Sequence, residues 1–484
     1  MPVTVTLSLI SHTNVGKTAL ARTLLRRDVG EVRDAPHVTE IAEAHEMIST
    51  PEGDRLLLWD TPGFGDSARL LKRLKQMSNP IGWLLSAVWD RFADRPFWCS
   101  QQAIKNVRDD ADIVLYLVSA AEAPADAGYV QAEMEILGWL ARPIVVVLNQ
   151  LGPPRGRIAL AQEEAVWRAH FSAFPHVKDV VPLDAFARCW VQELELLQRL
   201  TPLVPEEKQE AYRRLAAAWS ARNEATFEAA MHALAQFLTR AARDRESLNA
   251  AEQGVIETVA RVIGLGADDA QRAEHSAARQ LAERLDQATR ASTDELAALY
   301  GLESHASGEI LEELARHVEA TRPLNTKRAS LLGGVVTGAL SGLVADIATG
   351  GLSFGAATLA GAIAGAAGGR FIAHEYNKML GVDATELTWS DEFLGELTRG
   401  ALLRYLAVAH YGRARGAYVE STKPAQWDQA IGAITDTPDP ELTSAIAAVR
   451  DRADSSPFEA LLATRTRAAL GRLYPDAGFP RRAG

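Results

Sequence analysis

The sequence predicts an α/β domain with a doubly wound, mainly parallel sheet, followed by an all-α region. Two observations lead to this fold class. Within about the first 190 residues, apolar runs such as 112–119 and 144–148 alternate with helical patterns, as expected for parallel strands buried on both faces. No proline occurs between Glu206 and Arg322, where alanine is abundant and charge pairs recur at helical spacing.

The first strand signal, residues 3–10, leads into a loop suited to phosphate. Residues 11–18 fit the phosphate-loop pattern except at the first position, where serine replaces glycine. In this pattern Gly16 allows close approach of the backbone, Lys17 reaches the β- and γ-phosphates, and the Thr18 hydroxyl binds Mg²⁺. The other candidate nucleotide-binding residues of this stretch are Asn14, Val15 and Ala19.

A second motif follows at a suitable distance. The apolar run 55–59 ends in Asp-Thr-Pro-Gly at residues 60–63, which reads as a second strand followed by a phosphate-facing turn. Asp60 is the expected Mg²⁺-linked carboxylate, and Gly63 is the expected sensor of the γ-phosphate. The two motifs together predict a nucleoside triphosphate site at the carboxyl ends of the strands.

The Asn-x-Gly-Lys-Thr loop and the Asp-Thr-Pro-Gly-Phe-Gly-Asp segment at residues 60–66 resemble the Era, septin and dynamin-like, translation-factor-related side of the GTPase superfamily. More closely, the chain is similar to a bacterial family that joins such a domain to a C-terminal domain of unknown function. The resemblance implies a P-loop NTPase fold that binds GTP or GDP with Mg²⁺. It also implies catalytic roles for Lys17, Thr39 and Gly63, and metal binding by Thr18, Thr39 and Asp60.

Three positions bear on the rate of hydrolysis. Thr39, in the polar loop 28–39, either closes over Mg²⁺ and the γ-phosphate or simply faces solvent. Phe64 stands where small signalling GTPases carry a glutamine that orients the attacking water, so a low intrinsic rate is expected. Asn14 matches the asparagine that helps hold K⁺ in similar GTPases, or else it braces the loop by hydrogen bonds.

The residues expected to read the base match only in part. Asn149 ends an apolar run, but Gln150 and Gly152 replace the lysine and aspartate of the guanine-reading Asn-Lys-x-Asp motif. Asp184 and Ala185 follow the last strand signal and are placed like the segment whose backbone N–H meets the guanine O6. GTP is therefore favoured over ATP, although the departure leaves base specificity in doubt.

The composition limits the classes of binding partner and the cellular compartment that can be expected. A net charge of −11 and a pI near 5.6 argue against a nucleic-acid binder, so no DNA partner is expected. Cys99 and Cys189 are the only cysteines, which suits a reducing compartment, and the start of the chain shows no signal-peptide pattern. A cytoplasmic location is predicted. His12, inside the phosphate loop, contacts phosphate or a switch, or faces solvent.

Residues 331–369 form a second informative stretch. The segments 331–345 and 347–369 contain no charged side chain, and Asp346 is the only ionised group between them. Glycines repeat at a spacing of four, which lets two helices approach closely. The stretch predicts a Gly/Ala-rich helical hairpin that inserts into, or docks on, the inner face of the cell membrane, where it binds lipid or a membrane protein. The alternative is a hairpin buried in the helical region.

Trp83, Trp89 and Trp98 lie within the unusual insertion 76–100. They resemble an amphipathic element that rests on another surface, but packing on the second switch or the helical region is the favoured interpretation, because aromatic clusters usually belong to a core.

The predicted organisation has four parts: a GTPase domain at 1–200, a long-helix bundle or stalk at 201–323, the hairpin region at 324–375 and a C-terminal helical region at 376–484. Three functions fit this organisation. The nucleotide state of a slow GTPase controls a membrane-associated helical domain; or a nucleotide-gated adaptor with little hydrolysis recruits a membrane protein; or the chain is a ribosome- or RNA-linked GTPase like the Era group. Nucleotide-dependent homodimerisation is left open.

Overall fold

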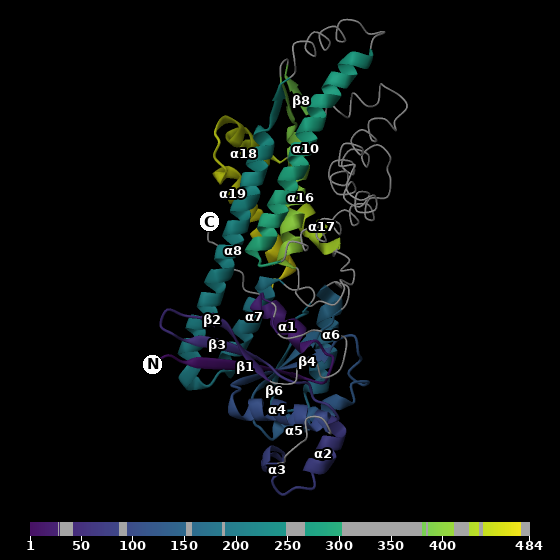
Figure 1. Ribbon diagram of the computed structural model, residues 1–484, viewed down its shortest axis with the longest axis vertical. Coiled ribbons are helices and arrows are strands. Elements are labelled where there is room, and N and C mark those ends of the chain that lie inside the picture. Colours follow the sequence, from purple (N-terminus) through teal and green to yellow (C-terminus); the bar gives the residue numbers. More distant parts are fainter. Residues whose placement is uncertain are drawn as a thin grey trace. The chain divides into compact units, whose positions relative to one another are not determined.

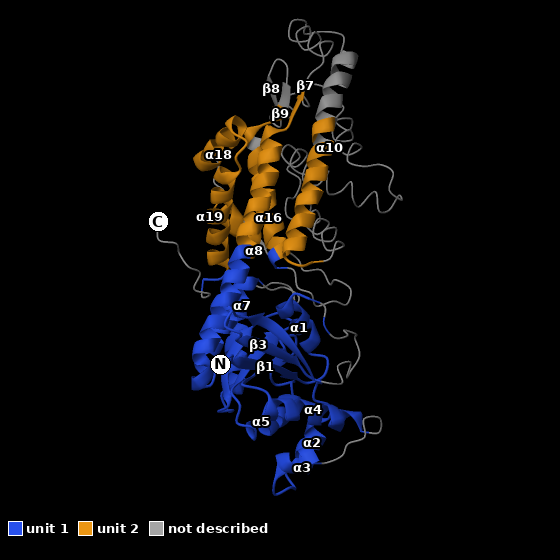
Figure 2. Ribbon diagram, turned by 60° about the vertical axis from the view of Figure 1, so that its left-hand side comes forward, with its two compact units in different colours: residues 1–225, 409–426, 474–484 blue, residues 226–408, 427–473 orange. Residues whose placement is uncertain are grey.

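The computed structural model describes residues 1–27, 29, 42–86, 94–151, 157–185, 189–247, 267–302, 380–383, 386–410, 425–434 and 439–475. The chain divides into two compact units, coloured separately in Figure 2: unit 1 comprises 1–225, 409–426 and 474–484, and unit 2 comprises 226–408 and 427–473. The division between residues 225 and 226 falls inside helix α8 (Gln209–Arg243).

Unit 1 is built on a six-stranded sheet with the order β2-β3-β1-β4-β5-β6 (Figure 1). Its strands are β1 (Thr4–Ser11), β2 (Glu43–Ser49), β3 (Arg55–Asp60), β4 (Ile113–Ser119), β5 (Ile144–Asn149) and β6 (Val177–Pro182). β2 runs antiparallel to β3, and the other neighbours are parallel. Every residue of β4 and β5 is buried, as the continuous apolar runs predict. The predicted mainly parallel sheet is thereby confirmed.

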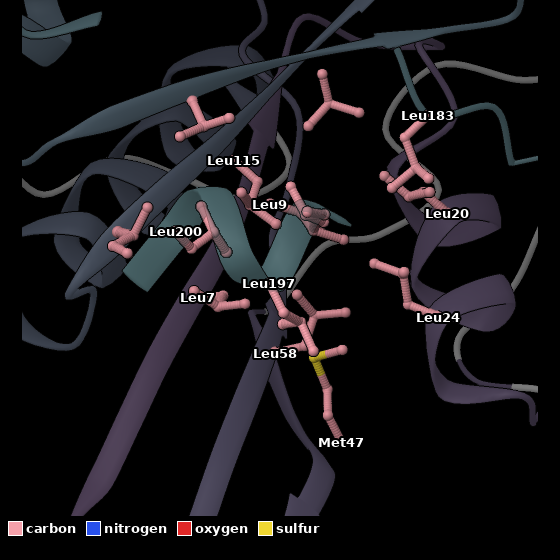
Figure 3. Close-up of a cluster of buried hydrophobic side chains, with 14 of the residues drawn as sticks. Leu7, Leu9, Leu20, Leu24, Met47, Leu58, Leu115, Leu183, Leu197 and Leu200 are labelled. Carbon is pink, nitrogen blue, oxygen red and sulfur yellow. The ribbon is translucent and has the colours of Figure 1, made fainter. Parts of the chain in front are cut away.

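Helices cover both faces of this sheet. They are α1 (Lys17–Leu25), α2 (Ser67–Leu74), α3 (Pro80–Ser86), α4 (Arg95–Asp109), α5 (Tyr129–Gly138), α6 (Arg157–Phe171), α7 (Trp190–Leu200) and the start of α8. On one face, leucines of β1 pack with residues of α1 and α7 in the first core cluster, shown in Figure 3. On the other face, Tyr116 and its neighbours on β4 pack with residues of α2, α4, α5 and α6 in the second core cluster. This is the doubly wound arrangement, with one apolar core on each face.

The start of α8 belongs to the α/β unit. Tyr212, Leu215 and Trp219 are fully buried and join the same cluster as the β1 leucines. Burying three side chains of this size contributes several kcal/mol, at roughly 1.5 to 3 kcal/mol for each. The first turns of α8 are therefore fixed to the nucleotide-binding unit by packing.

Unit 2 is largely helical. Besides the rest of α8 it contains α10 (Ala267–Leu299), most of α16 (Asp391–Ala409), part of α17 (Ala425–Gly432), α18 (Pro440–Asp451) and α19 (Ser456–Leu473). It also holds a three-stranded antiparallel sheet with the order β7-β9-β8, formed by Arg245–Ser247, Glu386–Trp389 and Leu380–Asp383. The expectation of an all-α region is wrong in this respect. Strands of three or four residues are too short to show a strand pattern, and β7 lies far from β9 in the sequence.

Several predicted features lie outside the described residues: the Gly-rich hairpin at 331–369, Thr39, Trp89 and Gly152. Within the ranges that the structure describes, no helix is both long enough and apolar enough to span a membrane. Trp83 of α3 is half-buried and packs against the second core cluster of unit 1, in keeping with the packing alternative for the tryptophan-rich insertion.

Candidate nucleotide-binding site

The loop between β1 and α1 takes a left-handed backbone at two positions, Asn14 with φ 65° and Gly16 with φ 89°. Such a sequence of conformations curls the chain so that successive N–H groups face one concave side, a form that binds anions. A Cβ atom at Gly16 would lie 2.8 Å from Asn149 Nδ2, so only glycine fits there. Helix α1 begins immediately afterwards at Lys17. The local geometry is that of a phosphate-binding loop.

Lys17, Thr18 and Asp60 come together beside this loop. The Thr18 hydroxyl donates to Asp60 Oδ2 at 2.6 Å. Lys17 is only 7% exposed, and its Nζ donates to Ser11 Oγ at 2.9 Å and to the His12 carbonyl at 3.3 Å. The pairing of β1 with β3 explains the proximity, because Leu9 lies opposite Asp60 in the parallel register. Residues from the two predicted motifs therefore meet at one edge of the sheet.

Burial shifts the pKa values of both charged groups in this cluster, Lys17 and Asp60. It lowers the pKa of Lys17 to about 8, although the negative charges of Asp60 and Glu133 act in the opposite direction. Burial also raises the pKa of Asp60 to about 6, against the hydrogen bond from Thr18 and the charge of Lys17. Buried charged groups whose pKa values are shifted in this way are enriched at functional sites.

The donor set fits Mg²⁺. Asp60 is 2% exposed, and its Oδ1 has no hydrogen-bond partner among the residues that the structure describes, so one buried carboxylate oxygen is available to a cation. The Thr18 hydroxyl lies beside it, and Mg²⁺ prefers hard oxygen ligands, with one or two from protein and the rest from phosphate and water. The described ranges contain no cluster of three His, Cys, Asp or Glu side chains that could hold a metal by themselves.

Gly63 lies directly against the phosphate loop. A Cβ atom there would lie 2.9 Å from Lys17 Nζ, at the end of a flexible side chain, and 3.0 Å from Thr13 Cα, a backbone contact tighter than most. The next residue, Phe64, donates its backbone N–H to the Ser11 carbonyl at 2.9 Å, while its side chain is fully buried in the second core cluster. Phe64 thus contributes backbone to the site and cannot orient a water molecule with its side chain.

Asn149 joins the phosphate loop to the segment after β6. Its Nδ2 donates to the Val15 carbonyl at 2.7 Å, and its Oδ1 accepts from the Ala185 N–H at 2.8 Å. The Asp184 carboxylate accepts from the N–H of Leu151 at 2.8 Å. The structure therefore brings three of the predicted base-side residues together at the ends of β5 and β6, and it shows their carboxylate and amide groups bracing the backbone there.

The other predicted loop residues are placed as follows. Val15 and Ala19 point into the first core cluster, so only their backbones are available to a ligand. The Asn14 side chain is exposed and makes no hydrogen bond to another described residue, and Gln150, with φ 56°, lies with its Nε2 3.5 Å from the Asn14 carbonyl. The K⁺ role of Asn14 stays a prediction.

The sequence did not predict that His12, in the phosphate loop, contacts Glu133 and Tyr129 of α5. His12 Nδ1 lies 2.8 Å from Oε1 of the fully buried Glu133, and the imidazole stacks on Tyr129 with ring centroids 4.5 Å apart. His12 is thus half-buried against α5 and does not simply face solvent. No local pattern could have shown this, because the two partners are 121 residues apart and meet only through the fold.

Comparison with known proteins first gives the class of the domain. Residues 6–150 match the profile of the family described as 50S ribosome-binding GTPase. Together with the loop, the Lys17–Asp60 cluster and the mainly parallel sheet, this match identifies the N-terminal part of the chain as a GTP-binding P-loop domain. Residues 173–470, more than half of the chain, match the profile described as domain of unknown function DUF3482, and the chain belongs to that family.

Individual relatives are distant. A chloroplastic translation initiation factor of Galdieria sulphuraria is 29% identical over 80 residues, which span 16% of this chain and 30% of that protein. A crystal structure of Era in complex with MgGDPNP and 16S ribosomal RNA is 16% identical, covering 43% of this chain and 58% of that one with a TM-score of 0.31. Toc33 of Arabidopsis thaliana is 15% identical, covering 38% and 72% with a TM-score of 0.26.

Proposed function

We propose that this protein is a slow, Mg²⁺-dependent GTPase whose nucleotide state acts on its helical C-terminal region through α8. The meeting of Lys17, Thr18 and Asp60 at the phosphate loop carries the proposal, because it combines an ammonium group with a cation-binding carboxylate. Lys17→Ala should abolish GTP binding, measured by titration with a fluorescent GTP analogue. Retained binding at wild-type affinity would refute the assignment.

The chemistry is mainly electrostatic. In phosphoryl transfer, negative charge spreads over the oxygens of the transferring group, so fixed positive charge and N–H donors lower the barrier. Lys17 exchanges its weak partners, Ser11 Oγ and the His12 carbonyl, for β- and γ-phosphate oxygens. Thr18 and Asp60 would hold Mg²⁺, which would supply further neutralisation of phosphate charge. Gly63, which lies against Lys17 and the phosphate loop, is the residue expected to sense the γ-phosphate.

The slow rate follows from Phe64. Its side chain is fully buried, so water must be oriented by another group, by a partner or with the help of K⁺ at Asn14. The same observation favours a second candidate, a nucleotide-gated adaptor with little hydrolysis. A single-turnover assay with and without K⁺ and lipid separates the two: turnover in any condition supports the GTPase, and its absence throughout supports the adaptor.

The link to the helical region is the attachment of α8 to the β2–β3 hairpin. Asp54, in the turn between these strands, is buried and accepts a hydrogen bond from Arg214 Nη2 at 2.6 Å. Arg222, two turns further along α8, donates to the Met47 carbonyl of β2 at 3.2 Å. Thr39 lies a few residues before β2 in the sequence, and β3 ends at Asp60. The hairpin therefore connects both segments that should respond to the γ-phosphate, and α8 is held at two places on it.

This coupling can be tested by hydrogen exchange in residues 226–243 of α8. Wild-type protein should show different exchange rates in this segment with GDP and with a non-hydrolysable GTP analogue. Arg214→Gln should reduce the difference. Lys208→Gln is the matched control, because Lys208, the residue directly before α8, donates to Asp112 at 2.8 Å and not to the hairpin. Equal exchange with both nucleotides in the wild type would contradict the proposal.

Membrane attachment is a further part of the proposal and rests on the uncharged segments within 331–369. The protein would then be cytoplasmic and held at the inner face of the cell membrane. Fractionation of cells into soluble and membrane pools, with residues 331–369 present or deleted, tests this part. Membrane recovery that depends on the segment supports it, and soluble recovery of both forms contradicts it. Co-sedimentation with ribosomes would instead support the Era-like, ribosome-linked alternative.

A further inference from the structure

Two side chains of α5 hold the phosphate loop at His12. Glu133 Oε1 lies 2.8 Å from His12 Nδ1, and the Tyr129 ring stacks on the imidazole with an interplanar angle of 19°. The second oxygen of Glu133 accepts a hydrogen bond from the Tyr116 hydroxyl of β4 at 2.7 Å. Glu133 is fully buried, so both of its oxygens are committed to donors inside the protein.

Packing alone does not account for a carboxylate at this position. Val130, Ile136 and Leu137, the neighbours of Glu133 at helical spacing, are apolar and belong to the second core cluster. A buried carboxylate is more costly than an apolar side chain of similar size unless its hydrogen bonds are complete. Glu133 is therefore the exception on an otherwise apolar face, and it lies where the face meets the phosphate loop.

His12 connects Glu133 to the groups that handle phosphate. The His12 carbonyl accepts from Lys17 Nζ at 3.3 Å, and the His12 backbone forms a parallel β-bridge with Phe64, the residue directly after Gly63. Fixing the imidazole thus fixes a backbone segment that touches both Lys17 and the turn expected at the γ-phosphate. A shift of His12 would displace both together.

We propose that Glu133 is a positioning residue of the nucleotide site, which acts through His12 to hold the phosphate loop and the turn at Gly63 in register. The proposal rests on the proposed nucleotide binding and adds a residue from outside every motif of the domain. If the proposal holds, the loss of Glu133 lowers the affinity for GTP more than the affinity for GDP, because the turn at Gly63 is expected to contact only the γ-phosphate.

The test uses the full chain and three variants: Glu133→Gln, His12→Ala and the double variant. Affinities for GDP and for a non-hydrolysable GTP analogue are measured with Mg²⁺ present, and folding is checked by thermal unfolding. Glu133→Gln should weaken the GTP analogue by about tenfold, as expected for a lost charged hydrogen bond, and GDP by less. The affinity of the double variant for the GTP analogue should be no lower than that of the single variant that binds it less tightly. Both changes remove the same interaction, so their effects should not add.

Glu193→Gln is the matched control, since Glu193 of α7 is also a buried carboxylate of unit 1, 1% exposed. Its nucleotide affinities should stay close to those of the wild type. Wild-type affinity in Glu133→Gln, equal losses for GDP and GTP, or additive effects of the two single changes would overturn the inference. These results presuppose a wild-type protein that binds GTP; failure of the wild type to bind would instead overturn the proposed function. His12→Ala changes a half-exposed loop side chain and keeps the test decisive if Glu133→Gln unfolds.

Discussion

Replacing Asn149 with alanine removes the side chain that ties the phosphate loop to the segment after β6. Asn149 is fully buried, and its two hydrogen bonds, to the Val15 carbonyl at 2.7 Å and from the Ala185 N–H at 2.8 Å, lie away from solvent. The change leaves both backbone groups without their partner. Because each unsatisfied buried group costs about 1 to 3 kcal/mol, the free energy of unfolding should fall by about 3 kcal/mol.

For a unit of this size the loss corresponds to a decrease in Tm of about 6 to 12 °C. Urea unfolding and thermal unfolding of the full chain provide the measurement, and titration with fluorescent GTP shows how much of the loss reaches the nucleotide site. Thr23→Val is the matched control. The Thr23 hydroxyl donates to the Ala185 carbonyl at 2.9 Å, and the loss of this neutral hydrogen bond should cost about 1 kcal/mol.

Two results would refute the reasoning on Asn149. One is an alanine variant whose free energy of unfolding lies within about 1 kcal/mol of the wild type, since that is the expected effect of a single bond. The other is a variant whose loss of stability does not exceed that of Thr23→Val. Either would mean that Asn149 does not brace the two segments together.

Gly63→Ala should weaken GTP by about tenfold or more and GDP by less, because the new methyl group would lie 2.9 Å from Lys17 Nζ and 3.0 Å from Thr13 Cα; equal titrations of Gly63→Ala and wild type would place Gly63 away from the γ-phosphate. In unit 2, burial acts to raise the pKa of Asp439, but hydrogen bonds from Arg465, at 2.5 and 2.7 Å, and from the backbone at the start of α18 outweigh it and hold that pKa below its usual value. A carboxyl group whose pKa is lower in the folded state stabilises the fold above the unfolded-state pKa of about 4, and the stabilisation is lost as the pH falls through the folded-state pKa. Asp439→Asn should therefore cost about 1 to 2 kcal/mol at pH 7 in urea unfolding, and the difference from wild type should shrink below about pH 4; a difference independent of pH would contradict this.

The parts of the fold that could be predicted are those whose burial leaves a continuous mark on the sequence. The apolar runs 112–119 and 144–148 become β4 and β5, which are buried on both faces. The proline-free, alanine-rich stretch between Glu206 and Arg322 predicts long helices, and the structure has α8 (Gln209–Arg243) and α10 (Ala267–Leu299) there. Local composition suffices for elements of this kind.

β2 illustrates what could not be predicted. Of its seven residues only Met47 is buried, because β2 lies at the sheet edge and pairs only with β3. Neither an apolar run nor a strict alternation marks such a strand. The strands of unit 2 were missed for a related reason, since they are shorter still.

In the candidate site, too, some features could be predicted from the sequence and others could not. Lys17, Thr18, Asp60 and Gly63 could be predicted as one site because phosphate chemistry fixes their order within two short motifs, and the structure brings them together. The bracing role of Asn149 and the clamp of Glu133 on His12 depend on contacts between distant segments, 134 and 121 residues apart. The predicted domain bounds at residues 200, 323 and 375 stay predictions, although unit 1 extends to residue 225.

The central claim is that a nucleoside triphosphate binds at the loop before α1, held by backbone amides and Lys17. Equilibrium titration of the purified full chain with fluorescent GTP and Mg²⁺ tests it most directly, with Lys17→Ala titrated in parallel. Saturable binding to the wild type, competed by GTP more strongly than by ATP and lost in Lys17→Ala, is the predicted result. A wild-type protein without affinity for any purine nucleoside triphosphate, or a Lys17→Ala variant that binds as well as the wild type, would contradict it.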